Sequence, residues 1–284
     1  MNVSLPQKTP TYRAWVQEAA KKLSAEGISS ARLDAEIILA HTIRKNRTYV
    51  HAHNDERLDI RQLEIADARL TLRLERTPIA YIIGHKEFYG RSFKVTPATL
   101  IPRPESETII TLLKEIVENQ PPSLLATPQR LIDIGTGSGC LGITAKLELP
   151  TLRVTLADIS NHALKVAESN AQALGGDVDI LHSDLLESYP FSPHYIIANL
   201  PYVDHSWELS PETQYEPELA LFASDNGLQL INKLVEEAST RLASNGYLFL
   251  EADPRQHQAI VMSAKDHHFS VHATDGFIIV LQKT

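Results

Sequence analysis

The chain has 284 residues, 43% hydrophobic and 22% charged, an ordinary composition for one large or two modest globular domains. It contains no run of about 18 apolar residues, which argues against membrane association. The polar N-terminus lacks the apolar core of a secretory signal, and the single cysteine, Cys140, excludes an internal disulfide. We therefore expect a cytoplasmic protein. A monomer is the default expectation.

Charge is distributed unevenly along the chain. Residues 1–90 hold 14 Lys and Arg against 11 Asp and Glu, a balance of +3, whereas residues 91–284 have a balance of −11. Proteins that bind along the phosphate backbone of a nucleic acid need clustered Lys and Arg. The acidic larger part therefore argues against a direct nucleic-acid substrate, although a local basic groove remains compatible with it. The histidines have no spacing typical of metal ligands, so no metal site is predicted.

Residues 1–83 are dominated by helical periodicity. Three apolar stripes predict three helices: the first begins near Thr9-Pro10 and ends at Gly27, the second begins near Ser30, and the third ends at Thr77-Pro78. The stripe residues are Trp15, Ala19 and Leu23; Leu33, Ile37 and His41; and Leu63, Ala66, Leu70 and Leu74. They predict the core of a small N-terminal bundle, and a partner-binding groove is the alternative.

Residues 84–100 predict a β-hairpin that links two domains, because Gly84, Gly90 and Pro97 punctuate short segments rich in aromatic and β-branched residues. In residues 101–284, short apolar runs alternate with helical segments. Strands are predicted at 131–134, 154–157, 180–181, 195–198, 247–250 and 277–281, and helices at 108–117, 160–174 and 227–242. This alternation predicts an α/β domain with a doubly wound, mostly parallel sheet.

A glycine loop follows the first of these strands. Asp133-Ile134-Gly135-Thr136-Gly137-Ser138-Gly139 opens a helix, and its glycines allow a ligand to approach the backbone closely. A loop that seats a pyrophosphate would need glycine where Cys140 stands. Asp158, at the end of the next strand, can accept hydrogen bonds from both ribose hydroxyls, and a helix cap is its alternative role. A nucleoside cofactor without phosphate, S-adenosylmethionine, is the predicted ligand.

Two further segments follow strand ends. Asp184 is predicted to bond an adenine amino group with Leu185 against the ring, and a turn residue is the alternative. Asn199-Leu200-Pro201-Tyr202 is predicted to hold the target of methyl transfer. The Asn199 side-chain oxygen and the Leu200 carbonyl can each accept one N–H of a planar amide or amine nitrogen, which aligns its lone pair with the methyl donor. Tyr202 could pack on the flat target.

With these motifs in place, the chain resembles the protein-(glutamine-N(5)) methyltransferases of peptide chain release factors, the HemK/PrmC family. The resemblance covers nearly the whole chain and includes Arg32-Leu33-Asp34-Ala35-Glu36, residues 84–95 and Leu100-Ile101-Pro102-Arg103-Pro104-Glu105-Ser106-Glu107. It implies a helical bundle that helps recognise the release factor (1–83), a β-hairpin linker (84–100) and a Rossmann-like class I S-adenosylmethionine methyltransferase domain (101–284).

The resemblance also implies the reaction, in which a methyl group passes from S-adenosyl-L-methionine to the side-chain amide of the glutamine in a Gly-Gly-Gln loop. Asn199, Leu200, Pro201 and Tyr202 would be catalytic and bind the glutamine. The implied cofactor contacts are Gly135, Thr136, Gly137, Ser138, Gly139, Asp158, Leu185 and Asn199, with Arg103 and Glu105 at the cofactor entrance.

The target motif departs from the family's usual Asn-Pro-Pro-Tyr, because Leu200 replaces the first proline and its fixed φ. Ribosomal RNA adenine-N(6) dimethylases carry Asn-Leu-Pro-Tyr, so an adenine-N(6) RNA or DNA methyltransferase is the alternative function. The helical domain, the Ile101 to Glu105 segment and the acidic catalytic half argue against it. Five acidic residues after the motif predict docking of a basic protein loop, or simply a solvated loop: Asp204, Glu208, Glu212, Glu216 and Glu218.

Overall fold

The computed structural model describes residues 9–121 and 128–284, so most of the N-terminal segment that we interpreted as lacking a signal falls outside the described residues. The chain forms two compact units. The helical unit comprises Met1–Gly84 and Pro211–Tyr215. The second unit comprises His85–Ser210 and Glu216–Thr284 and is named the catalytic unit after the domain that the sequence predicts to be catalytic. Within the described ranges, no helix is both long and apolar enough to cross a membrane.

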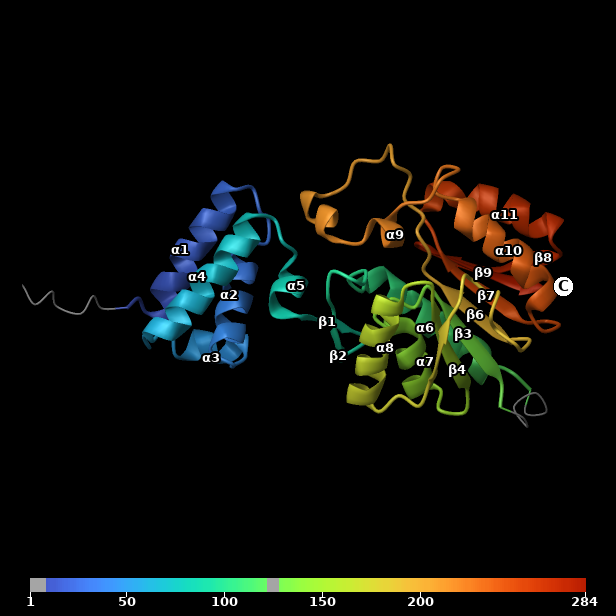
Figure 1. Ribbon diagram of the computed structural model, residues 1–284, viewed down its shortest axis with the longest axis horizontal. Coiled ribbons are helices and arrows are strands. Elements are labelled where there is room, and N and C mark those ends of the chain that lie inside the picture. Colours follow the sequence, from blue (N-terminus) through green and yellow to red (C-terminus); the bar gives the residue numbers. More distant parts are fainter. Residues whose placement is uncertain (1–8, 122–127) are drawn as a thin grey trace, which may run out of the picture. The chain divides into compact units, whose positions relative to one another are not determined.

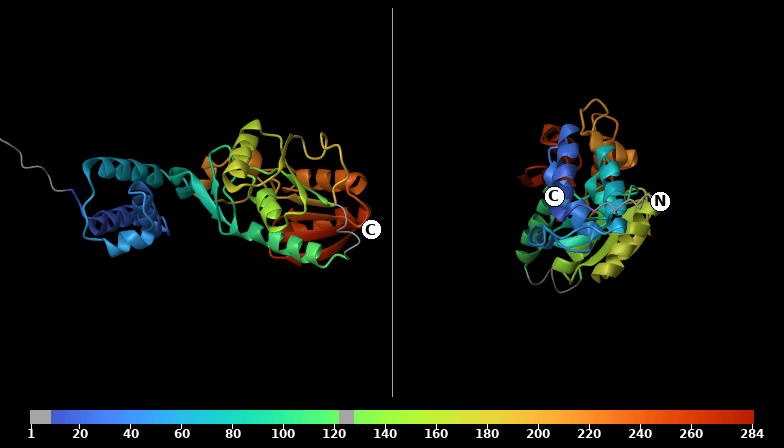
Figure 2. Two further views of the ribbon diagram at one scale, coloured as in Figure 1. Left: turned by 90° about the horizontal axis from the view of Figure 1, so that it is seen from below. Right: turned by 90° about the vertical axis from the view of Figure 1, so that its left-hand side faces the viewer.

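The helical unit is a small bundle, as the apolar stripes predicted (Figures 1 and 2). Its helices are α1 (Tyr12–Ala25), α2 (Ala31–Thr42), α3 (Arg47–Ala52), α4 (Ile60–Leu74) and α5 (Ile79–Ile83). The Thr11 side chain accepts a hydrogen bond from the Ala14 N–H and caps α1, so this helix begins two residues beyond the predicted Thr9-Pro10 start. Trp15, Ala19 and Leu23 are buried in the bundle core as expected.

The predicted core face of α2 is wrong. Leu33 is 42% exposed, whereas Ala35, Ile38 and Leu39 are fully buried. The error arises because α2 also buries two carboxylates, which a hydrophobic pattern assigns to the surface. Asp34 accepts a hydrogen bond from Arg73 Nε at 2.7 Å, and Glu36 is paired with two arginines of the same unit.

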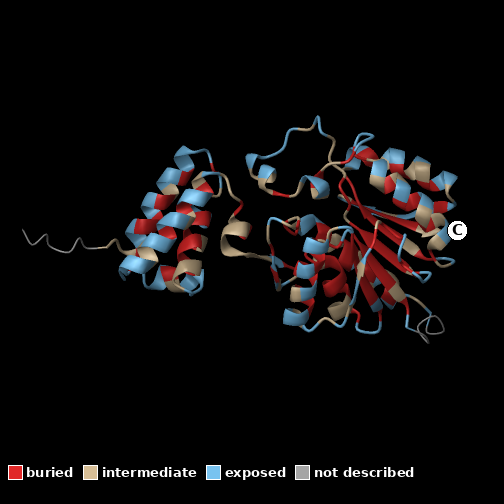
Figure 3. Cartoon of the chain, viewed as in Figure 1, coloured by how far each residue is buried: buried red, intermediate tan, exposed pale blue. Residues whose placement is uncertain are grey.

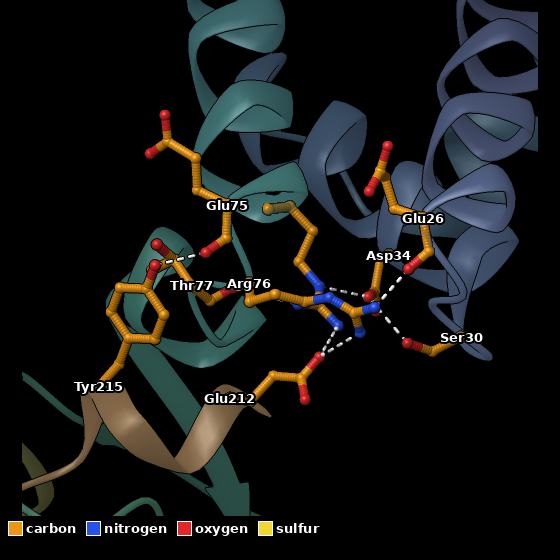
Figure 4. Close-up of polar contacts among 9 residues, drawn as sticks. Glu26, Ser30, Asp34, Glu75, Arg76, Thr77, Glu212 and Tyr215 are labelled. Atoms are coloured by element: carbon orange, nitrogen blue, oxygen red, sulfur yellow. Dashed lines mark hydrogen bonds and ion pairs between the residues drawn. The ribbon is translucent and has the colours of Figure 1, made fainter. Parts of the chain in front are cut away.

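A short segment from much later in the chain completes the helical unit. The 3₁₀ helix η2 (Pro211–Tyr215) belongs to it, although sequence analysis placed these residues in the catalytic domain. Glu212 Oε1 accepts hydrogen bonds from Arg73 Nη2 at 3.1 Å and from Arg76 Nη1 at 3.3 Å (Figure 4). The Tyr215 hydroxyl donates to the Glu75 carbonyl. Arg73 in the last turn of α4 and Arg76 just beyond this helix thus hold η2 against the bundle.

The catalytic unit begins with the predicted hairpin, in which β1 (His85–Phe88) and β2 (Arg91–Lys94) pair antiparallel. A seven-stranded sheet follows, in the order β5-β4-β3-β6-β7-β9-β8. Its strands are β3 (Arg130–Ile134), β4 (Arg153–Asp158), β5 (Asp179–His182), β6 (Tyr195–Ala198), β7 (Tyr247–Glu251), β8 (Phe269–Asp275) and β9 (Ile278–Lys283). All neighbours from β5 to β7 are parallel, and β9 and β8 are antiparallel, which confirms the predicted fold class.

Helices cover both faces of this sheet (Figure 1). One face packs against α6 (Glu107–Glu118), α7 (Cys140–Glu148) and α8 (Asn161–Leu174), and the other against α10 (Gln229–Arg241) and α11 (His257–Asp266). Strand residues alternate between the two cores: Tyr195 and Ile197 face the first, whereas Ile196 and Ala198 face the second. The central strands β3, β4, β6, β7 and β9 are accordingly mostly buried, whereas the edge strands β5 and β8 are largely exposed (Figure 3). Short helices η1 (Pro104–Ser106), α9 (Glu218–Leu221) and η3 (Pro254–Gln256) connect the larger elements.

The strand order reverses between β3 and β6. From β3 the chain winds outward through β4 to β5, then returns to place β6 on the other side of β3. Ligands of open α/β sheets bind in the crevice that such a reversal leaves at the carboxyl ends of the strands. The topology therefore locates the site beyond Ile134, Asp158 and Ala198, where the predicted motifs begin.

Candidate active site

A cavity of about 260 Å³ lies at this position in the catalytic unit. Residues 135–138 line it after β3, residues 158–160 after β4, residues 183–185 after β5 and residues 199–201 after β6. Residues 98–100 and the residues Pro217, Leu219 and Ala220 contribute further walls that sequence analysis did not predict. One of them, Leu219 on α9, lines the cavity and is 62% exposed.

The glycine loop is pinned to the end of β4. The Thr136 N–H donates to the Ala157 carbonyl at 3.0 Å, and the Gly137 N–H donates to Asp158 Oδ2 at 2.9 Å. Of the five loop residues predicted to contact a cofactor, Gly139 alone is absent from the cavity lining. It precedes α7 with φ of 81°, and a Cβ there would meet Ile143 Cδ1 at 2.6 Å. The absence of a side chain at Gly139 therefore allows α7 to pack beneath the loop.

Asp158 lines the cavity at the end of β4. Its Oδ1 accepts from the Ser160 N–H at 2.8 Å, and burial raises the pKa of its carboxyl. The helix-cap alternative does not describe it, because Ser160 is the N-cap of α8 and accepts from the Ala163 N–H. Each carboxylate oxygen has two lone pairs, so Asp158 can bind the loop and still accept two hydroxyl donors of a ligand.

Asp184 and Leu185 both line the cavity after β5. Asp184 Oδ2 pairs with Lys233 Nζ at 2.9 Å, and both side chains are partly exposed. Leu185 is buried and has φ of 44°, an uncommon left-handed conformation for a residue with a bulky side chain. Such backbone conformations cost about 1–3 kcal/mol and cluster at ligand sites.

The Asn199 segment leaves β6 with its first three residues on the cavity wall. Asn199 Nδ2 donates to Ser106 Oγ at 3.1 Å, and Ser106 Oγ donates to Glu251 Oε2. Tyr202 does not line the cavity. It packs against the hydrophobic core, and its hydroxyl donates to Glu251 Oε1 at 3.2 Å.

Glu251, at the end of β7, was not identified from the sequence. It is 2% exposed, and burial raises the pKa of its carboxyl. The only signal available was a lone acid at the end of the apolar run Tyr247-Leu248-Phe249-Leu250. Its partners Ser106 and Tyr202 lie 145 and 49 residues away in sequence, so no local pattern could connect them.

Arg103 and Glu105 differ in their placement. Arg103 lines the cavity, and its Nη2 pairs with Glu216 Oε1 at 2.6 Å. Glu105 is exposed and outside the cavity lining. Glu216 is buried and also accepts from the Ile101 N–H at 3.0 Å, so this carboxylate joins two cavity walls. Glu212 and Glu216 therefore have internal partners, and only exposed acids such as Glu208 and Glu218 remain for the predicted docking role.

Comparison with known proteins supports a methyltransferase. Residues 14–84 match the model of the PrmC N-terminal domain, and residues 111–213 match that of the methyltransferase small domain. A crystal structure of a methyltransferase from Pyrococcus furiosus aligns with a TM-score of 0.52 and 17% identity over 76% of this chain and 97% of that one, which supports the fold alone. Among the described residues, no cluster of His, Cys, Asp or Glu could hold a metal ion.

Two relatives of known name align over most of the chain. A bifunctional methyltransferase of Rickettsia conorii is 33% identical over 91% of this chain, which spans about half (54%) of that longer protein. The release factor glutamine methyltransferase of Escherichia coli is 35% identical over 88% of both chains. On this similarity, which extends through both units, the chain belongs to the release factor glutamine methyltransferase family that its motifs predicted.

Proposed function

We propose that this protein transfers a methyl group from S-adenosyl-L-methionine to the side-chain amide nitrogen of the glutamine in the Gly-Gly-Gln loop of release factors. The observation that carries the proposal is the shared cavity: Asn199, Leu200 and Pro201 border the same space as Asp158 and the glycine loop. A donor nucleoside and a target nitrogen can therefore meet there. The names of the relatives favour a protein glutamine over the alternative adenine target.

The chemistry of the lining fits the methyl donor. Asp158 retains two lone pairs for a ribose diol, and the buried side chains of Leu185 and Leu200 offer apolar contact for an adenine ring. Asp184 Oδ2 pairs with Lys233, so the other carboxylate oxygen of Asp184 is the one proposed to accept from the adenine amino group. When bound, S-adenosylmethionine supplies a methyl group made electrophilic by its positively charged sulfur.

The residues of the chain would act by orienting the target. The Asn199 side-chain nitrogen is committed to Ser106, which leaves the Asn199 oxygen to accept one N–H of the glutamine amide. The Leu200 carbonyl would accept the other. Both hydrogen bonds favour a pyramidal nitrogen with an available lone pair, so they strengthen as the transition state forms. The nitrogen loses its extra proton to water after the transfer.

Leu200 can replace the family's proline because its side chain is packed. It is 4% exposed within the hydrophobic core beneath β6, and Gly135 leaves room beside it: a Cβ on Gly135 would meet Leu200 Cδ2 at 3.2 Å. Burial of a leucine side chain contributes about 1.5–3 kcal/mol, which offsets the conformational freedom that proline would remove. The loop can thus be held in one geometry without a fixed φ.

Incubation with labelled donor and purified release factor, followed by mass mapping, tests the proposal. Label is expected on the glutamine of the Gly-Gly-Gln loop and is expected to disappear when that glutamine is replaced by alanine. Label on RNA alone would move the assignment to the adenine-N(6) alternative. Monomeric state and cytoplasmic location stay predictions from the sequence.

A further inference from the structure

The buried carboxylate of Glu251 stands behind the target-binding segment and takes no direct part in the proposed reaction. It lies at the carboxyl end of β7, beside β6, and receives hydrogen bonds from the hydroxyls of Ser106 and Tyr202. Ser106 in turn receives the Asn199 amide N–H. These residues come from η1, from β7 and from the segment after β6, so three elements meet at one carboxylate.

We propose that Glu251 is a positioning residue that acts through Ser106 to hold the Asn199 side chain with its oxygen toward the target nitrogen. This inference rests on the proposed function and names a determinant of its geometry. An asparagine amide carries an oxygen at one end and an NH₂ group at the other, and the two ends have nearly the same shape. Packing alone therefore discriminates poorly between the productive orientation and its reverse.

The hydrogen-bond chain is directional because its far end can only accept. An ionised carboxylate has no proton to donate, so the Ser106 hydroxyl must point its hydrogen at Glu251. The lone pairs of that hydroxyl then remain for Asn199, and only the NH₂ end of the amide can use them. The Asn199 oxygen is left on the other side, where the target nitrogen would lie. A neutral amide at position 251 could donate, which would remove this preference.

Four variants test this chain of contacts at mildly alkaline pH, which favours the ionised form of the Glu251 carboxyl. Ser106→Ala removes the link, Ser106→Thr keeps a hydroxyl, Glu251→Gln keeps the shape but can donate, and Ser106→Ala/Glu251→Gln combines the losses. We expect kcat to fall about 5- to 100-fold in Ser106→Ala and Glu251→Gln, the range for a buried hydrogen bond left unpaired. The dissociation constant of the methyl donor should stay within about twofold, as for a neutral substitution.

Two further results are expected. Ser106→Thr should restore most of kcat, and the double variant should be no slower than the slower single variant, because both changes break the same chain. Thr144→Val is the matched control: it removes an equally buried hydroxyl of α7 that has no hydrogen-bond partner among the described residues and lies outside the cavity lining. It should leave kcat unchanged.

The outcomes separate this inference from the proposed function. If the wild-type protein methylates the glutamine but Ser106→Ala keeps wild-type kcat, the positioning role is wrong while the function holds. A loss of donor binding that parallels the loss of kcat, or additive losses in the double variant, would also overturn it. If the wild-type protein labels RNA only, the proposed function fails. If Glu251→Gln does not fold, comparison of kcat between Ser106→Ala and Ser106→Thr still decides whether the Ser106 hydroxyl positions Asn199.

Discussion

At the scale of single residues, Asn199 carries the most specific prediction. Asn199→Ala removes the proposed acceptor for the target N–H while leaving the cavity floor, formed by Asp158 and the glycine loop, intact. We expect kcat to fall about 100- to 1,000-fold, as when one preorganised group of an active site is removed, with little change in donor affinity. Single-turnover methylation and donor titration measure the two quantities. Methylation at the wild-type rate would contradict the proposed mechanism.

Asp158 is expected to show the opposite behaviour. Asp158→Ala removes the acceptor for the ribose hydroxyls and also releases the Gly137 and Ser160 N–H groups that hold the loop and the start of α8. Hydrogen bonds to a charged acceptor contribute about 1.5–3 kcal/mol, so donor affinity should fall about 10- to 100-fold. Calorimetric titration of the donor measures this. An unchanged dissociation constant would mean that the ligand does not use this carboxylate.

At the scale of secondary-structure elements, Asp133 of β3 links this strand to the glycine loop and to α7. Its Oδ2 accepts from Thr136 Oγ1 at 2.6 Å and from the Gly142 N–H of α7 at 2.9 Å. Its Oδ1 is buried without a hydrogen-bond partner among the described residues. Burial raises the pKa of Asp133 from 3.8 to about 7. Between pH 3.8 and about 7, the folded protein therefore keeps a proton on Asp133 that the unfolded chain releases.

This proton predicts a pH dependence of stability. Between the ordinary pKa of 3.8 and about 7, the folded state binds more protons than the unfolded state, so this group's contribution to the free energy of unfolding falls as pH rises. The full loss is on the order of 4 kcal/mol. Asp133→Asn, which cannot ionise, should gain stability relative to the wild type across this range. Denaturant unfolding at several pH values measures the difference, and a constant difference would contradict the prediction.

The attachment of η2 is a second prediction at this scale. Arg73 is almost fully buried and shares Glu212 with Arg76, so Glu212→Gln leaves two guanidinium groups without a charged partner on η2. Hydrogen exchange at residues 211–215 should quicken by about 5- to 100-fold, while α7 and α8 keep their protection. Glu208→Gln, an exposed acid of the same loop, is the matched control and should change neither. Equal exchange in both variants would mean that the arginines do not hold η2.

Local patterns predicted most elements but failed wherever a distant partner decides the role of a residue. Strands β3, β4, β6 and β7 were predictable because they are buried on both faces and read as continuous apolar runs. The edge strand β8 was missed because most of its side chains are exposed. Asp34 and Glu251 were missed as buried groups, since the arginine and the hydroxyls that satisfy them lie 39 or more residues away. Motifs at strand ends predicted residues that line the cavity, but they did not predict Glu251, which stands behind these residues.

At the scale of the whole molecule, the division into two units predicts where ligand binding acts. Every residue that lines the cavity belongs to the catalytic unit, and the helical unit has its own core of α1, α2 and α4 residues. A ligand stabilises only the structure that forms its site, by about 2.7 kcal/mol at a concentration 100 times its dissociation constant. Donor binding should therefore slow hydrogen exchange in the catalytic unit alone.

Hydrogen exchange with mass spectrometry, with and without saturating methyl donor, measures this distribution directly. Peptides from the glycine loop, from residues 158–160 and from residues 199–201 should gain protection, while peptides of α1 and α4 should exchange at the same rate in both samples. Asp158→Ala under the same conditions is the control and should reduce the protection of the catalytic unit. Protection that spread into α1 and α4 would contradict this prediction and would show that donor binding also stabilises the helical unit.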